Sequence, residues 1–336
     1  MLLGLVIGGG LIAFSFRKMD LGHMFAQWRN VPWTAHCVMS ALVLAGLFFR
    51  GWRWWFTLPH AKRSEFWPAQ RSLVVGYALN NVGPRIGEVA RVYLLGKRTR
   101  RPYAQLASSV LLDRFVFDFM ALFVFLGFAV WGARPLLEKM LPGYHNQFGL
   151  LAVALSIGLV GALVGVLFPG RVLGLLGHLG LKRVPKLWSI IERLFRQMMD
   201  GLSILGSPRK YPALLGLSVL IWASYLANFF YGLHLFGIHG ATDQMLLVYT
   251  MTLLGMAVPS PGGIGTVHAF GQLALTSVMG IEPELGLLAI TYIHGLNYIV
   301  LSLLGLIAFV WELMRPNDLE RERIKHGSQV EAKNET

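Results

Sequence analysis

Several ionisable residues lie within otherwise apolar stretches, where they are best placed to do chemistry. Arg85, Glu88 and Arg91 recur at intervals of three beside a break rich in Gly and Pro. This spacing brings their side chains near one face of a helix. A helix N-terminus with free amides and an arginine can bind phosphate. The alternative is a purely structural pairing of the three charges.

The next apolar stretch contains a second set, Asp113, Arg114 and Asp118. Asp113 and Arg114 could form an interfacial pair without further function. Asp118 lies about two helical turns in, where a charge without a partner is costly. We therefore expect Arg85 or Arg91 to contact Asp113 or Asp118.

A second break contains Ser260, Gly262 and Gly263, and His268 lies just beyond it. A single histidine in a helix is more often a packing residue than a proton carrier. Its ordinary pKa of about 6.5 would still permit a proton-coupled step. His294 and Asn297 lie one turn apart in the last apolar stretch. They too could serve in packing or in a proton-coupled step.

Another group combines Arg50 and Arg53 with the three tryptophans Trp52, Trp54 and Trp55. Arginine and aromatic residues are typical of helix ends at a membrane interface. We interpret this group as an anchor for its helix.

The composition limits the class of protein. Of 336 residues, 55% are hydrophobic and 14% are charged, against about 25% charged in a soluble domain. This excludes a disordered chain and favours a polytopic membrane protein. The single cysteine, Cys37, cannot form an internal disulfide, and no zinc-type spacing or common catalytic motif occurs, so we expect no metal site and no cofactor.

Apolar runs long enough to cross a bilayer, together with a shorter first run, predict six transmembrane helices. The runs are Leu2 to Phe16, Trp33 to Phe56, Leu106 to Trp131, Gly149 to Phe168, Tyr211 to Phe236 and Leu285 to Trp311. Two further segments, Ser72 to Leu95 and Gln244 to Met279, are broken by Gly and Pro and are read as re-entrant helical hairpins. Such breaks at membrane depth require a covering cavity. The hairpins share an Ile-Gly-x-Val pattern, which indicates an inverted repeat of the kind found at transporter binding sites.

Basic residues set the orientation, because cytoplasmic loops are enriched in Lys and Arg. With both termini in the cytoplasm, 22 of the 30 Lys and Arg residues lie inside, five outside and three within the membrane region. Their placement between apolar runs argues against nucleic acid as a partner. We expect an integral protein of the cytoplasmic (inner) membrane, whose first hairpin enters from the cytoplasm and whose second enters from the opposite face.

The chain divides into a membrane domain and a tail. Residues 1–314 form the membrane domain, and within them residues 183–205 show the periodicity of an amphipathic interfacial helix. Residues 315–336 are polar and lack periodicity, which predicts a disordered cytoplasmic tail.

These motifs together resemble a known family. Arg53-Trp54, Asn81-x-x-Pro84-Arg85-x-Gly87-Glu88-x-x-Arg91, Asp113-Arg114 with Asp118, and Ser260-Pro261-Gly262-Gly263-x-Gly265 are similar to the flippase-like transmembrane domain of lysylphosphatidylglycerol synthases. The chain resembles the free-standing members, which lack the aminoacyl transferase domain. The family usually has Glu where this chain has His268.

The resemblance implies a lipid transporter that moves an anionic or lipid-linked head group across the membrane. Arg85 and Arg91 would hold the head group, with Glu88, Asp113 and Asp118 as exchanging partners. The expected substrate-binding residues are Arg85, Glu88, Arg91, Asp113, Arg114, Asp118, Ser260, Gly262, Gly263 and His268. The expected partner is a phospholipid or a polyprenyl or glycolipid head group, with a homo-oligomer or a lipid-synthesis enzyme as protein partner. The alternative is a membrane enzyme or accessory subunit acting on a lipid-linked substrate.

Overall fold

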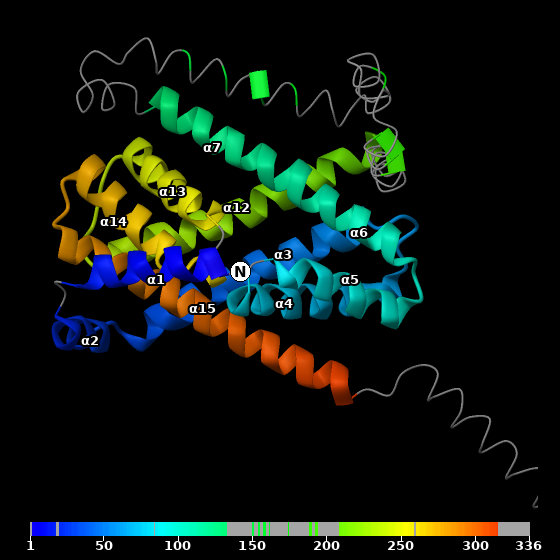
Figure 1. Ribbon diagram of the computed structural model, residues 1–336, viewed down its shortest axis with the longest axis horizontal. Helices are drawn as coiled ribbons and strands as arrows, with labels where there is room; N and C mark the ends of the chain where they lie inside the picture. The colour runs from blue at the N-terminus through cyan, green and yellow to red at the C-terminus, as the bar shows by residue number, and fades with distance from the viewer. Residues whose placement is uncertain are drawn as a thin grey trace, which may run out of the picture.

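The computed structural model is predominantly helical in the residues that it describes. These are residues 2–17, 20–83, 85–132, 208–258 and 260–314, with ten isolated residues between 150 and 193. No strand occurs among them. Figure 1 shows the helices as one bundle, with α1 (Leu2–Phe16) lying across the front of the view.

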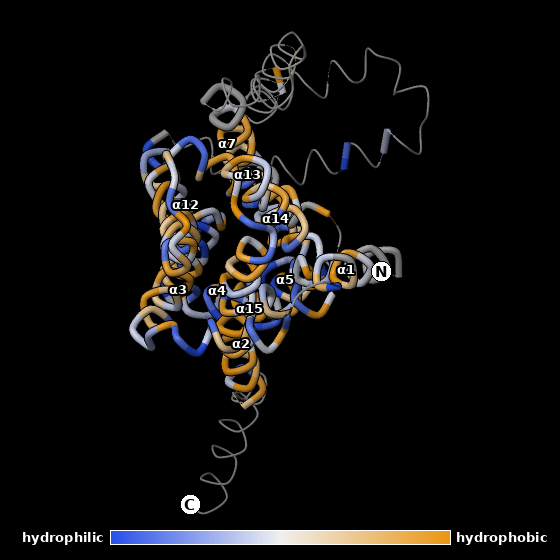
Figure 2. The backbone as a smooth tube through the Cα atoms, turned by 90° about the vertical axis from the view of Figure 1, so that its left-hand side faces the viewer, coloured by the Kyte–Doolittle hydropathy of each residue, from blue (hydrophilic) through white to orange (hydrophobic). Residues whose placement is uncertain are grey.

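Within the described part of the chain, three helices are long and apolar enough to cross a membrane: α3 (Trp33–Thr57), α12 (Tyr211–His234) and α15 (Pro283–Met314). The end of α15 nearest the C-terminus is hydrophobic in Figure 2, and Leu303, Leu306 and Ile307 on it are more than half exposed. Side chains of this kind are stable in contact with lipid, since a helix that is apolar on its outer face needs an apolar solvent.

The first helical hairpin consists of α4 (Phe66–Val82) and α5 (Ile86–Thr99), which lie side by side (Figure 1). Their backbones approach closely at two glycines. A Cβ atom on Gly87 would lie 1.7 Å from the carbonyl oxygen of Gly76. Only glycine permits this contact, which explains the Gly-rich break.

The second hairpin consists of α13 (Thr242–Ala257) and α14 (Thr266–Met279), with the short helix η6 (Pro261–Gly263) between them. Gly262, Gly263 and Gly265 have positive φ angles of 56°, 75° and 86°. Residues with a Cβ atom are disfavoured at these positive φ angles, so glycine is preferred at all three positions. The first helix packs on this turn, because a Cβ atom on Gly265 would lie 2.1 Å from the carbonyl oxygen of Gly8.

One long helical segment changes its winding in the middle. It begins as α6 (Tyr103–Leu111), continues as the π-helix η2 (Leu112–Asp118) and ends as α7 (Phe119–Gly132). π-Helical turns are rare in proteins, and many of those that occur lie at functional sites.

The connection between α3 and α4 ends in the short helix η1 (Arg63–Glu65). Arg101 donates hydrogen bonds to both carboxylate oxygens of Glu65, at 2.7 and 2.8 Å, and the Lys62 amide donates a third. Burial opposes ionisation of this carboxyl, but these hydrogen bonds hold its pKa below the usual range.

The structure confirms most of the helices expected from the apolar runs, with ends shifted by a few residues. Both broken segments are helix pairs. The short helices η5 (Pro208–Lys210) and α2 (Leu21–Arg29) were not predicted, although Asp20 caps α2 by accepting hydrogen bonds from two amides. The expected crossing at 149–168, the amphipathic helix at 183–205 and the tail at 315–336 lie outside the described residues, apart from isolated positions.

Candidate functional site

Two arginines of α3 point into the protein. Arg50 and Arg53, three residues apart on one helix face, are 3% and 0% exposed. Arg53 donates to Asp113 and Asp118, both at 2.9 Å, and to the Ser218 hydroxyl at 3.0 Å. Arg50 donates to Asp118 at 2.6 Å. Charges this deeply buried are tolerated because they are paired.

The carboxylates come from the π-helix η2. Asp113 is 0% exposed and Asp118 is partly buried, and both contact Arg53 although they are five residues apart. Arg114 of the same segment contacts Asp118 at 3.0 Å. The seven-residue π-helix therefore supplies three charges to one site.

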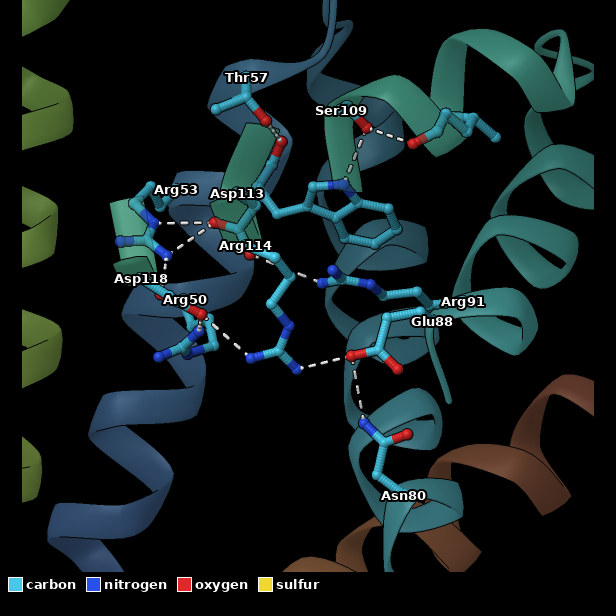
Figure 3. Close-up of polar contacts among 12 residues, drawn as sticks. Arg50, Arg53, Thr57, Asn80, Glu88, Arg91, Ser109, Asp113, Arg114 and Asp118 are labelled. Carbon is cyan, nitrogen blue, oxygen red and sulfur yellow. Dashed lines mark hydrogen bonds and ion pairs between the residues drawn. The ribbon is translucent and has the colours of Figure 1, made fainter. Parts of the chain in front are cut away.

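The first hairpin contributes Glu88 and Arg91 from α5 (Figure 3). Glu88 pairs with Arg114 at 3.0 Å, and Arg91 lies 3.6 Å from Asp113. Asn80, at the end of α4, donates to Glu88 at 3.5 Å and accepts a hydrogen bond from the Gly87 amide. We define the cluster as seven residues: Arg50, Arg53, Glu88, Arg91, Asp113, Arg114 and Asp118.

Aromatic rings surround the cluster. The Arg91 guanidinium lies 5.1 Å from the centroid of the Trp54 ring. The guanidinium groups of Arg114 and Arg50 lie 4.9 and 5.5 Å from the centroid of the Tyr77 ring. Ring faces attract cations within about 6 Å. They stabilise the guanidinium groups without competing for the carboxylates.

The cluster has more cations than anions. Its four arginines face three carboxylates, which leaves a formal charge of +1. The three guanidinium nitrogens of Arg91 have no hydrogen-bond partner within the described residues, although this side chain is 1% exposed. Buried polar groups almost always have a partner, so an orphaned group indicates a place for a ligand or water. The geometry favours an anion at Arg91.

The second group of expected site residues lies at the turn of the other hairpin. Ser260 and Thr266 share a hydrogen bond of 2.9 Å between their hydroxyls. His268 accepts a hydrogen bond from the Gly265 amide at 3.3 Å, and its ring centroid lies 5.2 Å from that of His294. These contacts stabilise the conformation of the turn in the second hairpin.

The turns of the two hairpins meet on α15. Tyr298 of α15 donates its hydroxyl proton to the Asn81 carbonyl at 3.0 Å, and Asn81 donates to Ser302 at 2.9 Å. A Cβ atom on Gly262 would lie 2.7 Å from the Tyr298 ring and 3.2 Å from the Asn81 Cα atom. Asn80 and Asn81 thus join the cluster to the second turn.

The expected contact between an arginine of the first hairpin and an aspartate is confirmed for Arg91 with Asp113. Arg85 is different, because it precedes α5 with a positive φ of 63° and is exposed. No contact between Arg85 and the cluster is found in the described structure. Of the two arginines for which the contact was expected, Arg91 therefore makes it.

The interfacial reading of Arg50, Arg53 and Trp54 is wrong, because all three are buried, whereas Trp52 is 40% exposed. An aspartate at membrane depth requires a cation, and two arginines three residues apart in an apolar helix could supply it. The sequence contained this pattern, but the neighbouring tryptophans favoured an interfacial interpretation of the two arginines.

Comparison with known proteins places the chain in a family. A family model described as the lysylphosphatidylglycerol synthase TM region matches residues 1–305. A UPF0104 membrane protein of Methanothermobacter thermautotrophicus is 24% identical over 325 residues, which cover 90% of this chain and 89% of that protein. No solved structure matches. The chain therefore belongs to the family of membrane domains described as the lysylphosphatidylglycerol synthase TM region.

Proposed function

We propose that this integral membrane protein moves a lipid with an anionic or lipid-linked head group across the membrane. One observation carries the proposal: the buried guanidinium of Arg91 has no hydrogen-bond partner among the described residues. Guanidinium groups bind phosphate oxygens in pairs, with charge-assisted hydrogen bonds. Family membership supports a membrane role and is consistent with lipid movement.

The distances within the cluster support an exchange of partners. Asp113 lies 2.8 Å from Arg53 but 3.6 Å from Arg91. An incoming phosphate can therefore replace Asp113 at Arg91 while Asp113 stays with Arg53. A monoanion would bring the formal charge of the cluster from +1 to zero, which reduces the energetic cost of the buried charges. The lipid tail would remain in the bilayer.

The proposed topology has six crossings and two re-entrant hairpins, which enter from opposite faces and meet at α15. The Asn81–Tyr298 contact supports this meeting point. The open end of the first hairpin, where α4 begins and α5 ends, carries Arg63 and the basic run Lys97 to Arg101, as expected of a cytoplasmic face. Both termini would then lie in the cytoplasm, with the protein in the inner membrane. A homo-oligomer or a lipid-synthesis enzyme is the protein partner that we propose.

A membrane enzyme acting on a lipid-linked substrate is the alternative. General acid or base catalysis needs a carboxyl group that exchanges protons near the operating pH. Each carboxylate of the cluster instead lies within 3.0 Å of an arginine, so each is held in an ion pair rather than open to a substrate. Transport is the better supported function.

Head-group accessibility in liposomes tests this proposal. Purified wild type, Arg91→Gln and Arg85→Ala would be compared with fluorescent phosphatidylglycerol and phosphatidylcholine. Loss of charge-assisted hydrogen bonds worth about 1.5–3 kcal/mol should weaken head-group binding by about 10- to 100-fold in the Gln variant. Arg85→Ala is the matched control, since it removes an exposed arginine from the same hairpin.

We expect wild type and Arg85→Ala to move the anionic lipid and Arg91→Gln to lose this movement. Equal movement by all three proteins would refute the site. If wild type moves neither lipid faster than protein-free liposomes, the transport function fails.

A further inference from the structure

The π-helix η2 (Leu112–Asp118) brings Asp113 and Asp118 to the same guanidinium group. Residues five apart in an α-helix point about 140° away from each other, because each residue turns the helix by about 100°. With about 4.4 residues per turn in a π-helix, the same two residues are only about 50° apart. The contact of both carboxylates with Arg53 therefore depends on the π winding.

The two carboxylates share one guanidinium group. Arg53 donates from Nε to Asp113 and from Nη2 to Asp118, each at 2.9 Å, and its Nη2 nitrogen also lies 2.8 Å from Asp113. The second oxygen of Asp113 faces Arg91 and has no hydrogen-bond partner within the described residues. If an anion occupies Arg91, repulsion disfavours this orientation. Asp113 can then turn both of its carboxylate oxygens toward Arg53. This weakens the hydrogen bond from Arg53 to Asp118.

Asp118 can leave Arg53 without becoming unpaired. It also accepts from Arg50 of α3 at 2.6 Å and from Arg114, four residues away in the same segment, at 3.0 Å. Residues four apart are neighbours in α winding and in π winding. The Arg114–Asp118 pair therefore persists through a change of winding, whereas the shared contact with Arg53 does not.

A change of winding in η2 would act on both hairpins. Glu88 and Arg91 of the first hairpin contact Arg114 and Asp113. On the other side, α7 continues directly from η2 and packs against α13 of the second hairpin. Phe125 of α7 lies edge-on to Tyr249 of α13, with ring centroids 5.6 Å apart.

We infer that η2 is the joint that couples occupancy of Arg91 to movement of the second hairpin. An anion at Arg91 transfers Asp113 fully to Arg53, Asp118 keeps Arg50 and Arg114 but loses Arg53, and the segment adopts α winding. This rotates α7 against α13 and changes the packing around the second turn. The inference rests on the proposed function, because it takes a lipid phosphate as the anion at Arg91.

Distances between spin labels test the movement in the intact protein. Cys37 is the sole cysteine of the chain, so Cys37→Ser gives a background without cysteine. One label pair joins Val124 of α7 to Val38 of α3, and a control pair joins Leu215 of α12 to Val38; all three positions are exposed. Side chains lie about 5 Å from a helix axis, so rotation of α7 should move its label by an amount on the order of 5–10 Å.

We expect the Val124–Val38 distance to change when phosphatidylglycerol is added to phosphatidylcholine nanodiscs, and the Leu215–Val38 distance to stay constant. With Arg91→Gln the first distance should not change. An unchanged distance in wild type that binds phosphatidylglycerol would overturn the inference, and so would an equal change in the control pair.

A register variant tests the same point by function. A π segment holds one residue more than an α segment over the same turns, so deletion of Val116 should fix α winding. The variant should bind phosphatidylglycerol but move it at least about tenfold more slowly than wild type. Movement at the wild-type rate would overturn the inference and leave the proposed function intact, whereas a wild type that moves no lipid defeats the proposed function. If the deletion prevents folding, the spin-label distances in wild type decide.

Discussion

Replacement of Arg53 by Ala should strongly destabilise the protein. This side chain is 0% exposed and donates to Asp113, Asp118 and Ser218 within 3.0 Å. Its charge-assisted hydrogen bonds contribute about 1.5–3 kcal/mol each when counted separately. Both carboxylates keep other arginines nearby, so the net loss should lie near the value for a broken buried pair, about 3–5 kcal/mol.

Unfolding of the purified protein by increasing SDS in mixed micelles, followed by tryptophan fluorescence, measures this loss. Arg63→Ala is the matched control, because it removes an exposed arginine beyond the end of α3 and should change stability by less than about 0.5 kcal/mol. A double-mutant cycle of Arg53→Ala with Asp113→Asn should give a coupling energy of about 1–3 kcal/mol. If Arg53→Ala costs no more than Arg63→Ala, the cluster is not the stabilising centre described above.

Three further changes test other parts of the structure in the same unfolding assay. Gly87→Ala should destabilise the first hairpin by about 1–3 kcal/mol or more, because the new Cβ atom meets a backbone oxygen of the facing helix, whereas Gly216→Ala on an open helix face should be neutral or stabilising. Tyr298→Phe should cost about 0.5–1.5 kcal/mol by removing the hydroxyl that bonds α4 to α15; no loss would argue against that contact. The pKa of Glu65 is lowered in the folded state, so its pair with Arg101 stabilises the fold above the ordinary Glu pKa of about 4.3 and loses this effect as pH falls toward the folded pKa. Glu65→Gln should flatten the decline of stability below about pH 4.3, and an unchanged pH profile would contradict the assignment.

Much of the fold could be predicted because lipid imposes simple rules on sequence. Runs of apolar residues predicted α1, α3, α12 and α15, since a spanning helix must satisfy its backbone groups internally and present apolar side chains. Gly and Pro marked both hairpin turns, where close backbone approach and positive φ angles exclude other residues. These features depend on local sequence alone.

The site was only partly predictable because its contacts join distant segments. Arg85 or Arg91 was expected to contact Asp113 or Asp118, and Arg91 contacts Asp113. The assignment of Arg50 and Arg53 required knowledge of which helix lies beside η2. The π winding also left no mark in a single sequence. Asp113 and Asp118 are five residues apart, a spacing that α-helical reasoning places on different faces.

The central claim is that Arg91 binds the phosphate of a lipid head group. Single-particle cryo-electron microscopy of the protein in phosphatidylglycerol nanodiscs tests this most directly. We expect phosphate density within hydrogen-bond distance of the Arg91 guanidinium, with Asp113 turned toward Arg53, and no such density in Arg91→Gln. Head-group density at Arg85 or elsewhere, with Arg91 still facing Asp113 alone, would contradict it.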